Sequence, residues 1–175
     1  MPLQDRKELA AMQEHKDICF RPIGYFRTPF SSPVGMPIQP AGARGVRGHV
    51  ELIAEYQDGL KDLDGFSHVF VLYHLHEIGG YKLLTTPFLD VIPHGIFATR
   101  SPARPNPIGL SVLRVIGIND GKLELEDVDV LDGTPVLDIK PYVAEFDACD
   151  ADRFGWFEGN SERAREHRAD ERFTT

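Results

Sequence analysis

The sequence lacks the features of a membrane-spanning or secreted protein. No apolar run approaches the roughly 18 residues that are needed to cross a membrane. The opening stretch, MPLQDRKELAAMQEHKD, has neither the apolar segment nor the small-residue cleavage site of a secretory signal. Only two cysteines occur, Cys19 and Cys149, too few for a disulfide framework, and we interpret them as unpaired, buried thiols. We therefore expect a cytoplasmic protein.

Glycine-rich motifs that bind nucleotides are missing as well. The chain contains no Gly-x-Gly-x-x-Gly fingerprint, no phosphate-binding glycine loop and no nucleophile elbow. The pair Gly79-Gly80 is typical only of a loop. A Rossmann-type dinucleotide-binding domain is therefore excluded.

Positive charge is scarce overall but concentrated locally. The formal net charge is −8, which disfavours nucleic-acid binding, because phosphate neutralisation usually dominates affinity. Yet the fixed charges from residue 21 to residue 47 are all arginines, namely Arg21, Arg27, Arg44 and Arg47. We interpret them as solvated arginines on an ordinary surface, and the alternative is a local basic patch on an acidic protein.

Short strand-like runs dominate the middle of the chain. HVELIAEY, HVFVLYHLHE, LSVLRVIGI and KLELEDVDVL are rich in β-branched and aromatic residues, and Gly, Pro, Asn and Asp separate such runs. Asn119-Asp120-Gly121 predicts a hairpin between the last two runs. At 175 residues the chain is expected to form one all-β domain, a sandwich or barrel rather than alternating βαβ units.

The two ends of the chain differ from this middle part. Residues 5–16 favour helix by propensity, and the charged stretch GNSERAREHRADERF predicts a solvated helix or a loose tail. We divide the chain into an N-terminal helical arm (1–17), a β-domain (18–147) and a partly helical C-terminal tail (148–175). Trp156 is predicted to dock this tail onto the β-domain or a dimer partner; the alternative is that it completes the core.

The segment Ala98 to Ser111, ATRSPARPNPIGLS, combines rigidity with polar donors. Prolines at 102, 105 and 107 each fix φ near −65° and bias the preceding residue towards extended geometry. Arg100, Ser101, Arg104 and Asn106 offer donors suited to phosphates, carboxylates or base edges. The segment is interpreted as a preorganised binding edge, and the alternative is a rigid connector whose polar groups satisfy its own backbone.

A second polar segment follows the last hairpin. Asp129 and Asp132 bracket two apolar residues just before a Gly-Thr-Pro turn. Their carboxylates are placed to accept hydrogen bonds from hydroxyl or amino groups, or to lie near a cation. The alternative is that Asp132 and Asp138 cap turns, as aspartate often does.

His74 and His76 lie two residues apart on a predicted strand, so they share a face. Together with Glu77 they are a candidate metal site, to which His68 and His94 are possible additions. No second ligand pair occurs at a recognised spacing, and histidines on strands are commonly core residues. We therefore expect no metal ion.

Taken together, these segments resemble the TsaA-like (TrmO) family. ATRSPARPNPIGLS is similar to the family's signature, and Ile23-Gly24 with RTPF resembles its opening strand. GL at 59–60 with LDGFSH at 63–68 matches the next landmark, and Asp129 to Tyr142 matches the closing one. The resemblance covers about residues 18–147, with its motifs in the family's order.

The resemblance implies a fold, an activity and partners. The fold is a small all-β barrel with short peripheral helices that binds S-adenosylmethionine without a Rossmann sheet. The expected enzyme is an S-adenosylmethionine-dependent tRNA methyltransferase that acts on N6 of threonylcarbamoyl-adenosine beside the anticodon. Threonine-accepting tRNA is the expected partner, and a homodimer is the expected assembly. The alternatives are a non-catalytic module that binds S-adenosylmethionine or RNA, and a metalloenzyme that uses the histidine pair.

The same resemblance implies which residues form the site. Cofactor positions are Pro37, Ile38, Gln39, His76, Glu77, Arg100, Leu110, Asp129, Val130, Leu131 and Asp132. Residues expected to contact the RNA are Arg104, Asn106, Arg44 and Arg47. Arg100, Asn106 and Asp132 are the candidates for a catalytic role, and no general base is assigned.

Overall fold

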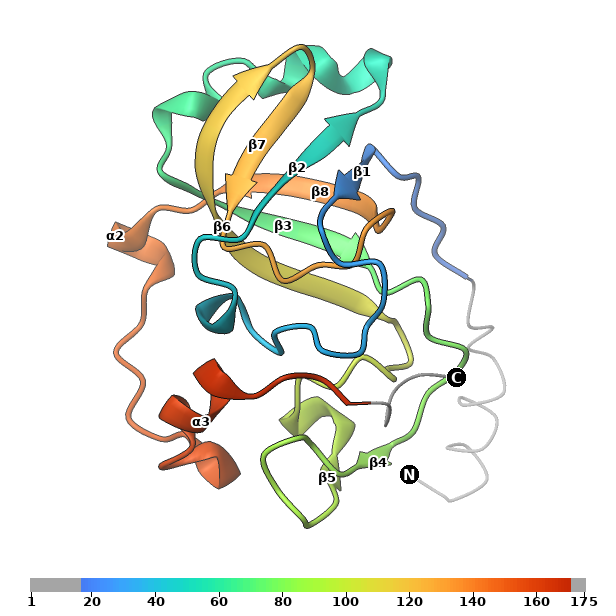
Figure 1. The fold of residues 1–175 in the computed structure, drawn as a ribbon, viewed down its shortest axis with the longest axis vertical. Helices are drawn as coiled ribbons and strands as arrows, with labels where there is room; N and C mark the ends of the chain where they lie inside the picture. Colours follow the sequence, from blue (N-terminus) through green and yellow to red (C-terminus); the bar gives the residue numbers. More distant parts are fainter. Residues whose placement is uncertain (1–16, 171–175) are drawn as a thin grey trace, which may run out of the picture.

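The computed structural model describes residues 17–170, so the predicted helix at 5–16 lies outside the described residues. Eight strands and short helices follow one another along the chain (Figure 1). The strands are β1 (Gly24–Arg27), β2 (Arg47–Leu52), β3 (His68–His74), β4 (Leu84–Thr85), β5 (His94–Gly95), β6 (Ile108–Asn119), β7 (Lys122–Glu126) and β8 (Pro135–Pro141). The α-helices are α2 (Ala144–Asp147) and α3 (Ser161–Glu166), and the 3-10 helices are η1 (Pro40–Gly42), η2 (Ala54–Leu60), η3 (Leu63–Gly65), η4 (Ile96–Ala98) and η5 (Gly155–Phe157).

Six of the strands form a closed antiparallel barrel in the order β1-β2-β7-β6-β3-β8. Closure leaves no open sheet edge, which is the usual solution to the exposed-edge problem in small all-β proteins. The predicted all-β barrel without a Rossmann sheet is therefore confirmed. Strands β4 and β5 form a separate two-stranded sheet at the far end of the molecule from the β6–β7 hairpin (Figure 1).

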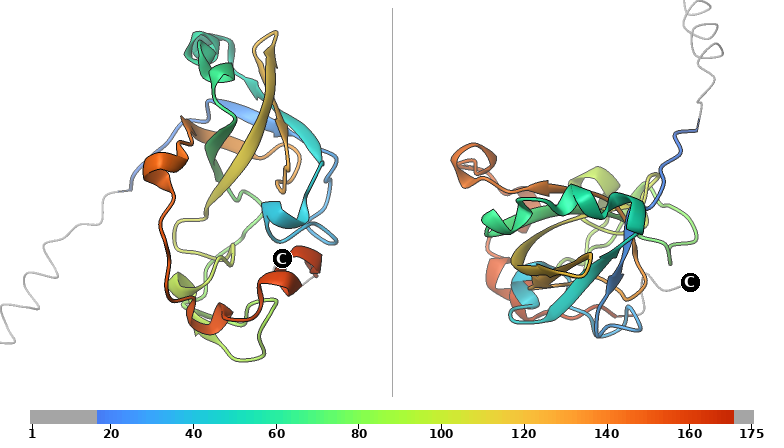
Figure 2. Two further views of the ribbon diagram at one scale, coloured as in Figure 1. Left: turned by 90° about the vertical axis from the view of Figure 1, so that its left-hand side faces the viewer. Right: turned by 90° about the horizontal axis from the view of Figure 1, so that it is seen from above.

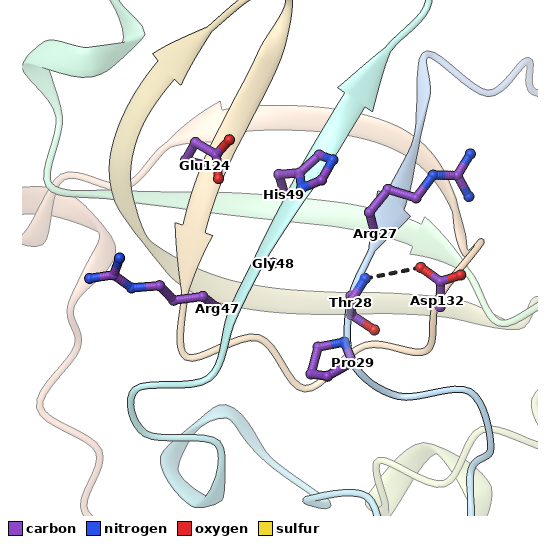
Figure 3. A pocket seen from close by; sticks show the side chains of 8 residues that line it. All are labelled: Arg27, Thr28, Pro29, Arg47, Gly48, His49, Glu124 and Asp132. Atoms are coloured by element: carbon purple, nitrogen blue, oxygen red, sulfur yellow. Dashed lines mark hydrogen bonds between the residues drawn. The ribbon is translucent and has the colours of Figure 1, made fainter.

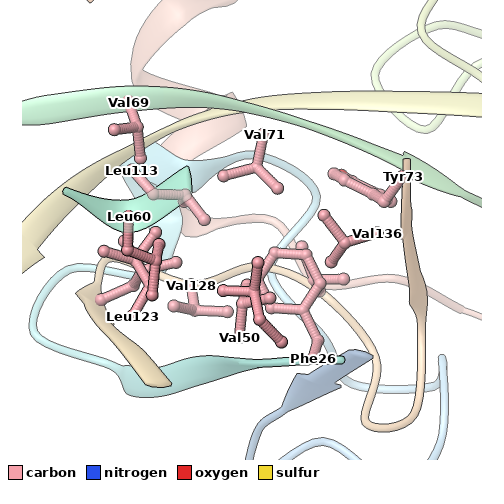
Figure 4. Packing of buried hydrophobic residues seen from close by; sticks show 13 residues of the cluster. Phe26, Val50, Leu60, Val69, Val71, Tyr73, Leu113, Leu123, Val128 and Val136 are labelled. Atoms are coloured by element: carbon pink, nitrogen blue, oxygen red, sulfur yellow. The ribbon is translucent and has the colours of Figure 1, made fainter. Parts of the chain in front are cut away.

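The barrel interior is filled by alternate residues of each strand. On β3, Val69, Val71 and Tyr73 are buried while their neighbours are partly exposed, as the two-residue period of a strand requires. Phe26 from β1 packs edge-on against the Tyr73 ring, with centroids 5.7 Å apart. Figure 4 shows these side chains meeting Leu113, Leu123 and Val136 inside the barrel.

The predicted hairpin at Asn119-Asp120-Gly121 is confirmed and joins β6 to β7. Asn119 pairs with Lys122, and the two intervening residues have positive φ angles, 47° at Asp120 and 72° at Gly121. Two consecutive positive φ values match the type I′ turn, whose twist suits a two-residue hairpin. The local turn chemistry thus sets the register of the longest strand.

The interpretation of Cys19 and Cys149 as buried thiols is wrong, because both are free and exposed. Neither belongs to a strand: Cys19 precedes β1, and Cys149 follows α2. These connecting segments have no part in the barrel interior, where the apolar side chains gather. Among residues 17–170, no helix has the length and apolar character that a membrane crossing requires.

Gly109 marks a close approach between β3 and β6. It pairs with Tyr73 across the two strands, and a Cβ atom at this position would overlap the Tyr73 ring. We therefore expect Gly109→Ala to lower the free energy of unfolding by about 1–3 kcal/mol, the usual cost of overpacking. Urea denaturation measures this. Gly117→Ala is the matched control on the same strand, where the added Cβ meets open space; an equal loss in both variants would contradict the steric explanation.

Candidate functional site

Three polar side chains form a hydrogen-bonded chain at the edge of the apolar core. The Ser111 hydroxyl on β6 donates to Asp129 Oδ1 at 2.9 Å, and Ser111 Oγ lies 3.0 Å from the Tyr73 hydroxyl on β3. Because a serine hydroxyl carries one proton, Tyr73 is the donor to Ser111 when Ser111 donates to Asp129. Asp129 itself lies between the buried Val128 and Val130. This series of hydrogen bonds thus directs the Tyr73 and Ser111 hydroxyl groups towards the Asp129 carboxylate.

Burial shifts the pKa values of two members of this hydrogen-bonded series, Asp129 and Tyr73. Loss of hydration raises the pKa of the Asp129 carboxyl to about 6, although the Ser111 hydrogen bond and the Arg100 charge act in the opposite direction. Burial, followed by the charge of Asp129, raises the pKa of Tyr73 above its ordinary value. Tyr73 therefore remains a protonated donor at neutral pH, while Asp129 ionises just below it.

Arg100 brings the signature loop to the loop after β1. This arginine is exposed and follows η4, and its Nη1 donates to Gln39 Oε1 at 2.8 Å. Its positive charge also lowers the pKa of Asp129, so the guanidinium acts on that carboxyl. Gln39 and Arg100, two predicted cofactor residues from distant parts of the sequence, are therefore in contact, and the Arg100 charge acts on a third, Asp129. Pro37 is buried beside Gln39, and Ile38 is partly buried.

Asp132 ties the acidic segment to the end of β1. Its Oδ1 accepts a hydrogen bond from the backbone N–H of Thr28 at 3.0 Å, and its own N–H donates to the carbonyl of Phe30 at 2.8 Å. The Thr28 hydroxyl donates to the carbonyl of Val130 at 2.8 Å. Asp132 thus has the turn-capping role that was one of its two interpretations, and its exposed carboxylate also borders the site. Leu131, which lies between Val130 and Asp132 in the sequence, is partly buried.

Within the signature loop, Arg104 faces its own backbone. Its Nη1 donates to the carbonyls of Thr99 at 2.8 Å and Ile96 at 3.2 Å. This is the rigid-connector role, and it leaves Arg100 as the arginine that points out of the loop. Asn106 is exposed. Ser101 is buried, and its hydroxyl has no hydrogen-bond partner within the described part of the chain.

The remaining predicted cofactor residues lie near the same end of β3 and β6. Leu110 on β6 exposes 59% of its surface, on the face of the strand opposite to the buried Ser111. His76 Nε2 lies 3.4 Å from Glu77 Oε1 just beyond the end of β3. His74 is exposed. Among residues 17–170, no three His, Cys, Asp or Glu side chains are grouped so that they could hold a metal ion.

The arginines of the candidate basic patch that lie on strands have carboxylate partners. Arg27 pairs with Glu51 at 3.2 Å, and Arg47 lies 3.8 Å from Glu126. Both arginines line a shallow depression on the outside of the barrel, together with His49, Glu124 and Asp132 among others (Figure 3). The depression therefore carries both signs of charge and meets the site at Asp132. Arg44 is exposed.

Tyr73 and Ser111 were not among the predicted site residues. Both occupy inward-facing positions of strands, where alternation alone predicts core packing. The available signal was Ser111, because a hydroxyl at a buried position needs a partner. That signal does not reveal which carboxylate provides the partner, since the contact joins β6 to the segment after β7.

Fold and site together define the class of this protein: a small closed β-barrel with a polar, loop-built site at one end, in place of a Rossmann sheet. Comparison with known families is specific. Residues 25–148 match the model of the tRNA-methyltransferase O N-terminal domain, and the chain belongs to this family. The family predicted from the sequence motifs is therefore confirmed.

Individual relatives agree with this assignment. A probable S-adenosyl-L-methionine-binding protein of Pyrococcus abyssi is 48% identical over 156 residues, 89% of this chain and 85% of that protein. A tRNA (adenine(37)-N6)-methyltransferase of Mus musculus is 37% identical, over 77% of this chain and 33% of its own length. The crystal structure of TrmO from Pseudomonas aeruginosa matches with a TM-score of 0.68 at 39% identity, over 81% of this chain and 63% of that one. This chain thus spans most of the archaeal relative but only a third of the mouse enzyme.

The Asp129→Asn variant tests the cost of burying the site carboxylate. The folded-state pKa of about 6 lies above the ordinary value of 3.8, so the unfolded chain releases this proton at lower pH. Wild type therefore loses stability relative to the variant as the pH rises from about 4 to about 6. A pKa difference of about two corresponds to on the order of 3 kcal/mol. Urea denaturation at pH 4 and pH 7.5 measures the change, and a difference between the two proteins that stays constant with pH would refute it.

Proposed function

We propose that this chain binds S-adenosylmethionine at the Asp129 end of the barrel and transfers its methyl group to N6 of an adenosine beside a tRNA anticodon. The observation that carries the proposal is the convergence of Gln39, Arg100 and Asp129. Their positions are those that the family resemblance implies for the cofactor. The names of the relatives, S-adenosyl-L-methionine-binding proteins and tRNA (adenine(37)-N6)-methyltransferases, support the same cofactor and reaction.

The donor set at this end of the barrel fits the cofactor's chemistry. Arg100 is a forked cationic donor suited to the carboxylate of the methionine part. Asp129 and Asp132 are acceptors suited to its ammonium group and ribose hydroxyls, and the exposed Leu110 offers an apolar surface for adenine. The buried Ser101 hydroxyl, which has no partner among the described residues, is a further polar group available in the same loop.

The residues of the chain contribute orientation above all. S-adenosylmethionine supplies an electrophilic methyl group on a sulfonium centre. Holding an acceptor nitrogen in line with such a group is worth roughly 7–11 kcal/mol of barrier, and the proline-rich loop is suited to that task because it loses little entropy on ordering. With a pKa of about 6, Asp129 is ionised at neutral pH and able to accept a hydrogen bond or a proton at Oδ2.

The proposed substrate is threonylcarbamoyl-adenosine in threonine-accepting tRNA, and the proposed location is the cytoplasm. The charge pattern supports an RNA path across the site rather than over the whole acidic surface. Arg100 lies at the site, and Arg44 forms no ion pair with any other described residue, whereas Arg27 and Arg47 have glutamate partners. Asn106, exposed on the signature loop, is the proposed neutral donor to the RNA.

Methyl transfer from labelled S-adenosylmethionine to unmethylated threonine tRNA that carries the threonylcarbamoyl group tests this function. Wild type should transfer label, and Arg100→Ala should reduce the rate at least tenfold with little change in thermal stability, because Arg100 is an exposed residue. Arg114→Ala removes another exposed arginine, on β6, and should leave the rate near wild type. Cofactor binding without transfer to any RNA in a broad pool would instead identify a non-catalytic module.

We also propose a homodimer, formed through the lobe that contains β4 and β5. Large apolar side chains are exposed in residues 81–97, among them Leu84 at 67%, Val91 at 90% and Phe97 at 77%. Monomeric proteins rarely leave so many apolar groups together in water. A second copy of the same lobe provides a cover of matching chemistry, and a self-complementary patch is what a two-fold dimer requires.

Introducing a charged residue into this lobe tests whether the lobe forms the dimer interface. Wild type should elute as a species of twice the 19.6 kDa chain mass, and Val91→Asp should shift it to the mass of one chain, because a buried carboxylate in an apolar interface is costly. Light scattering coupled to size-exclusion chromatography measures both. Phe146→Asp is the control, since Phe146 is 74% exposed on α2, outside the lobe. A wild-type mass of one chain would rule the dimer out.

A further inference from the structure

The chain beyond the barrel returns to the site end of the molecule. After α2, it passes alongside the barrel to the β4–β5 lobe and then turns through α3 towards the loop after β1 (Figure 1, Figure 2). We call residues 154–170 the strap. The strap lies outside the region that matches the family model, which stops at residue 148. Its contacts divide into two anchors.

The first anchor is Trp156, which holds the segment just before Arg100. Its Nε1 donates to the carbonyl of Ala98 at 2.7 Å. Its ring stacks on His94, with centroids 4.9 Å apart and planes inclined by 18°. His94 in turn is bound to Asp90, with Nε2 and Oδ2 2.9 Å apart. The predicted docking of Trp156 is thus onto the lobe and the start of the signature loop, rather than into the barrel core.

The second anchor pairs the strap with the loop that carries Gln39. Gly35 donates its N–H to the carbonyl of Ala169, and Ala169 donates its N–H to the carbonyl of Met36, both at 2.8 Å. Pro37 and Arg168 form an antiparallel bridge at the same place. This geometry is that of a short added strand, and it ends one residue before Ile38-Gln39.

Gly42 shows how closely the strap lies against this loop. A Cβ atom at Gly42 would be 2.8 Å from the backbone carbonyl oxygen of Arg165, too close unless the strap shifts. Gly42 lies in η1, immediately after the Gln39 loop. Ala164 of the strap is buried as well. The strap is therefore packed against the loop as well as hydrogen-bonded to it.

A side-chain hydrogen bond at the site joins the two anchored loops, where Arg100 donates to Gln39. No strand pairing of the barrel joins these two loops directly. We propose that the strap is a positioning element for the cofactor site, which holds the Gln39 loop and the Arg100 loop at the separation where they bind one ligand together. This inference rests on the proposed function. Ordering both loops before binding removes an entropic cost that the ligand would otherwise meet.

Two variants loosen the anchors without replacing a site residue. Gly42→Ala pushes the strap away from the Gln39 loop, and Gly65→Ala is its matched control, because a Cβ at Gly65 meets open space. Trp156→Phe keeps an aromatic ring against His94 but removes the N–H that binds Ala98. Phe146→Leu is the control for a conservative change of an exposed aromatic side chain, on a helix away from the strap.

Titration calorimetry with S-adenosylmethionine, hydrogen exchange of the ligand-free protein and urea denaturation are measured on the full chain. We expect Gly42→Ala and Trp156→Phe to raise the Kd for S-adenosylmethionine about tenfold. The amides of Gly35 and Ala169 should exchange faster in Gly42→Ala, while the denaturation midpoint of the barrel stays near wild type. Both control variants should bind like wild type.

The outcomes separate the strap from the proposed function. Faster exchange at Gly35 and Ala169 with an unchanged Kd overturns the positioning role and leaves the strap as a cover over apolar surface. A tenfold loss of affinity that is equal in the control variants also overturns it. If wild type itself does not bind S-adenosylmethionine, the proposed cofactor and the strap's role are refuted together.

Discussion

The pairing of the first barrel strand with the last is the constraint on which the rest of the structure depends. Ile23 donates to Val136, Phe26 donates to Thr134, and Gly133 donates back to Phe26, at 2.8–3.0 Å. We call this contact between residues 23–26 and 133–136 the seam. Without it the six strands would form an open sheet with two unpaired edges, and Phe26 would not reach Tyr73. The seam also brings Thr28 against Val130 and Asp132, so that the closure of the barrel and the assembly of the site are one event.

The polar site exists because the apolar core is interrupted at one end. Along β3 and β6 the inward residues are Val69, Val71 and Leu113 until Tyr73 and Ser111 follow. Their hydroxyl groups need partners once they are buried, and Asp129 provides the acceptor. The donor Ser111 lies on β6, whereas the carboxylate lies on the segment that follows β7. On each of these strands, a core residue and a site residue thus occupy consecutive inward-facing positions.

Features that depend on neighbouring residues in the chain could be predicted from the sequence. The turn at Asn119 to Gly121, the two-residue alternation and the family motifs were enough for the barrel, because each depends on neighbours in the chain. The contacts of Arg100, Ser111 and Trp156 depend on how distant segments are placed against one another, which no local pattern specifies. For the same reason Arg104 looked equivalent to Arg100 in the sequence. In the fold, Arg104 closes its own loop and Arg100 crosses to Gln39.

The arrangement also explains how binding at this site would act on the whole fold. Three segments carry the site residues: 28–39 and 129–132 adjoin the two sides of the seam, and 98–110 follows the lobe that contains β4 and β5. A ligand that contacts these segments together has affinity for the closed barrel and little for a chain in which they are apart. By mass action such a ligand stabilises the closed form, and the gain grows with the logarithm of its concentration above Kd. Opening the seam would separate Thr28 from Val130 and Asp132, so such a ligand would oppose that opening.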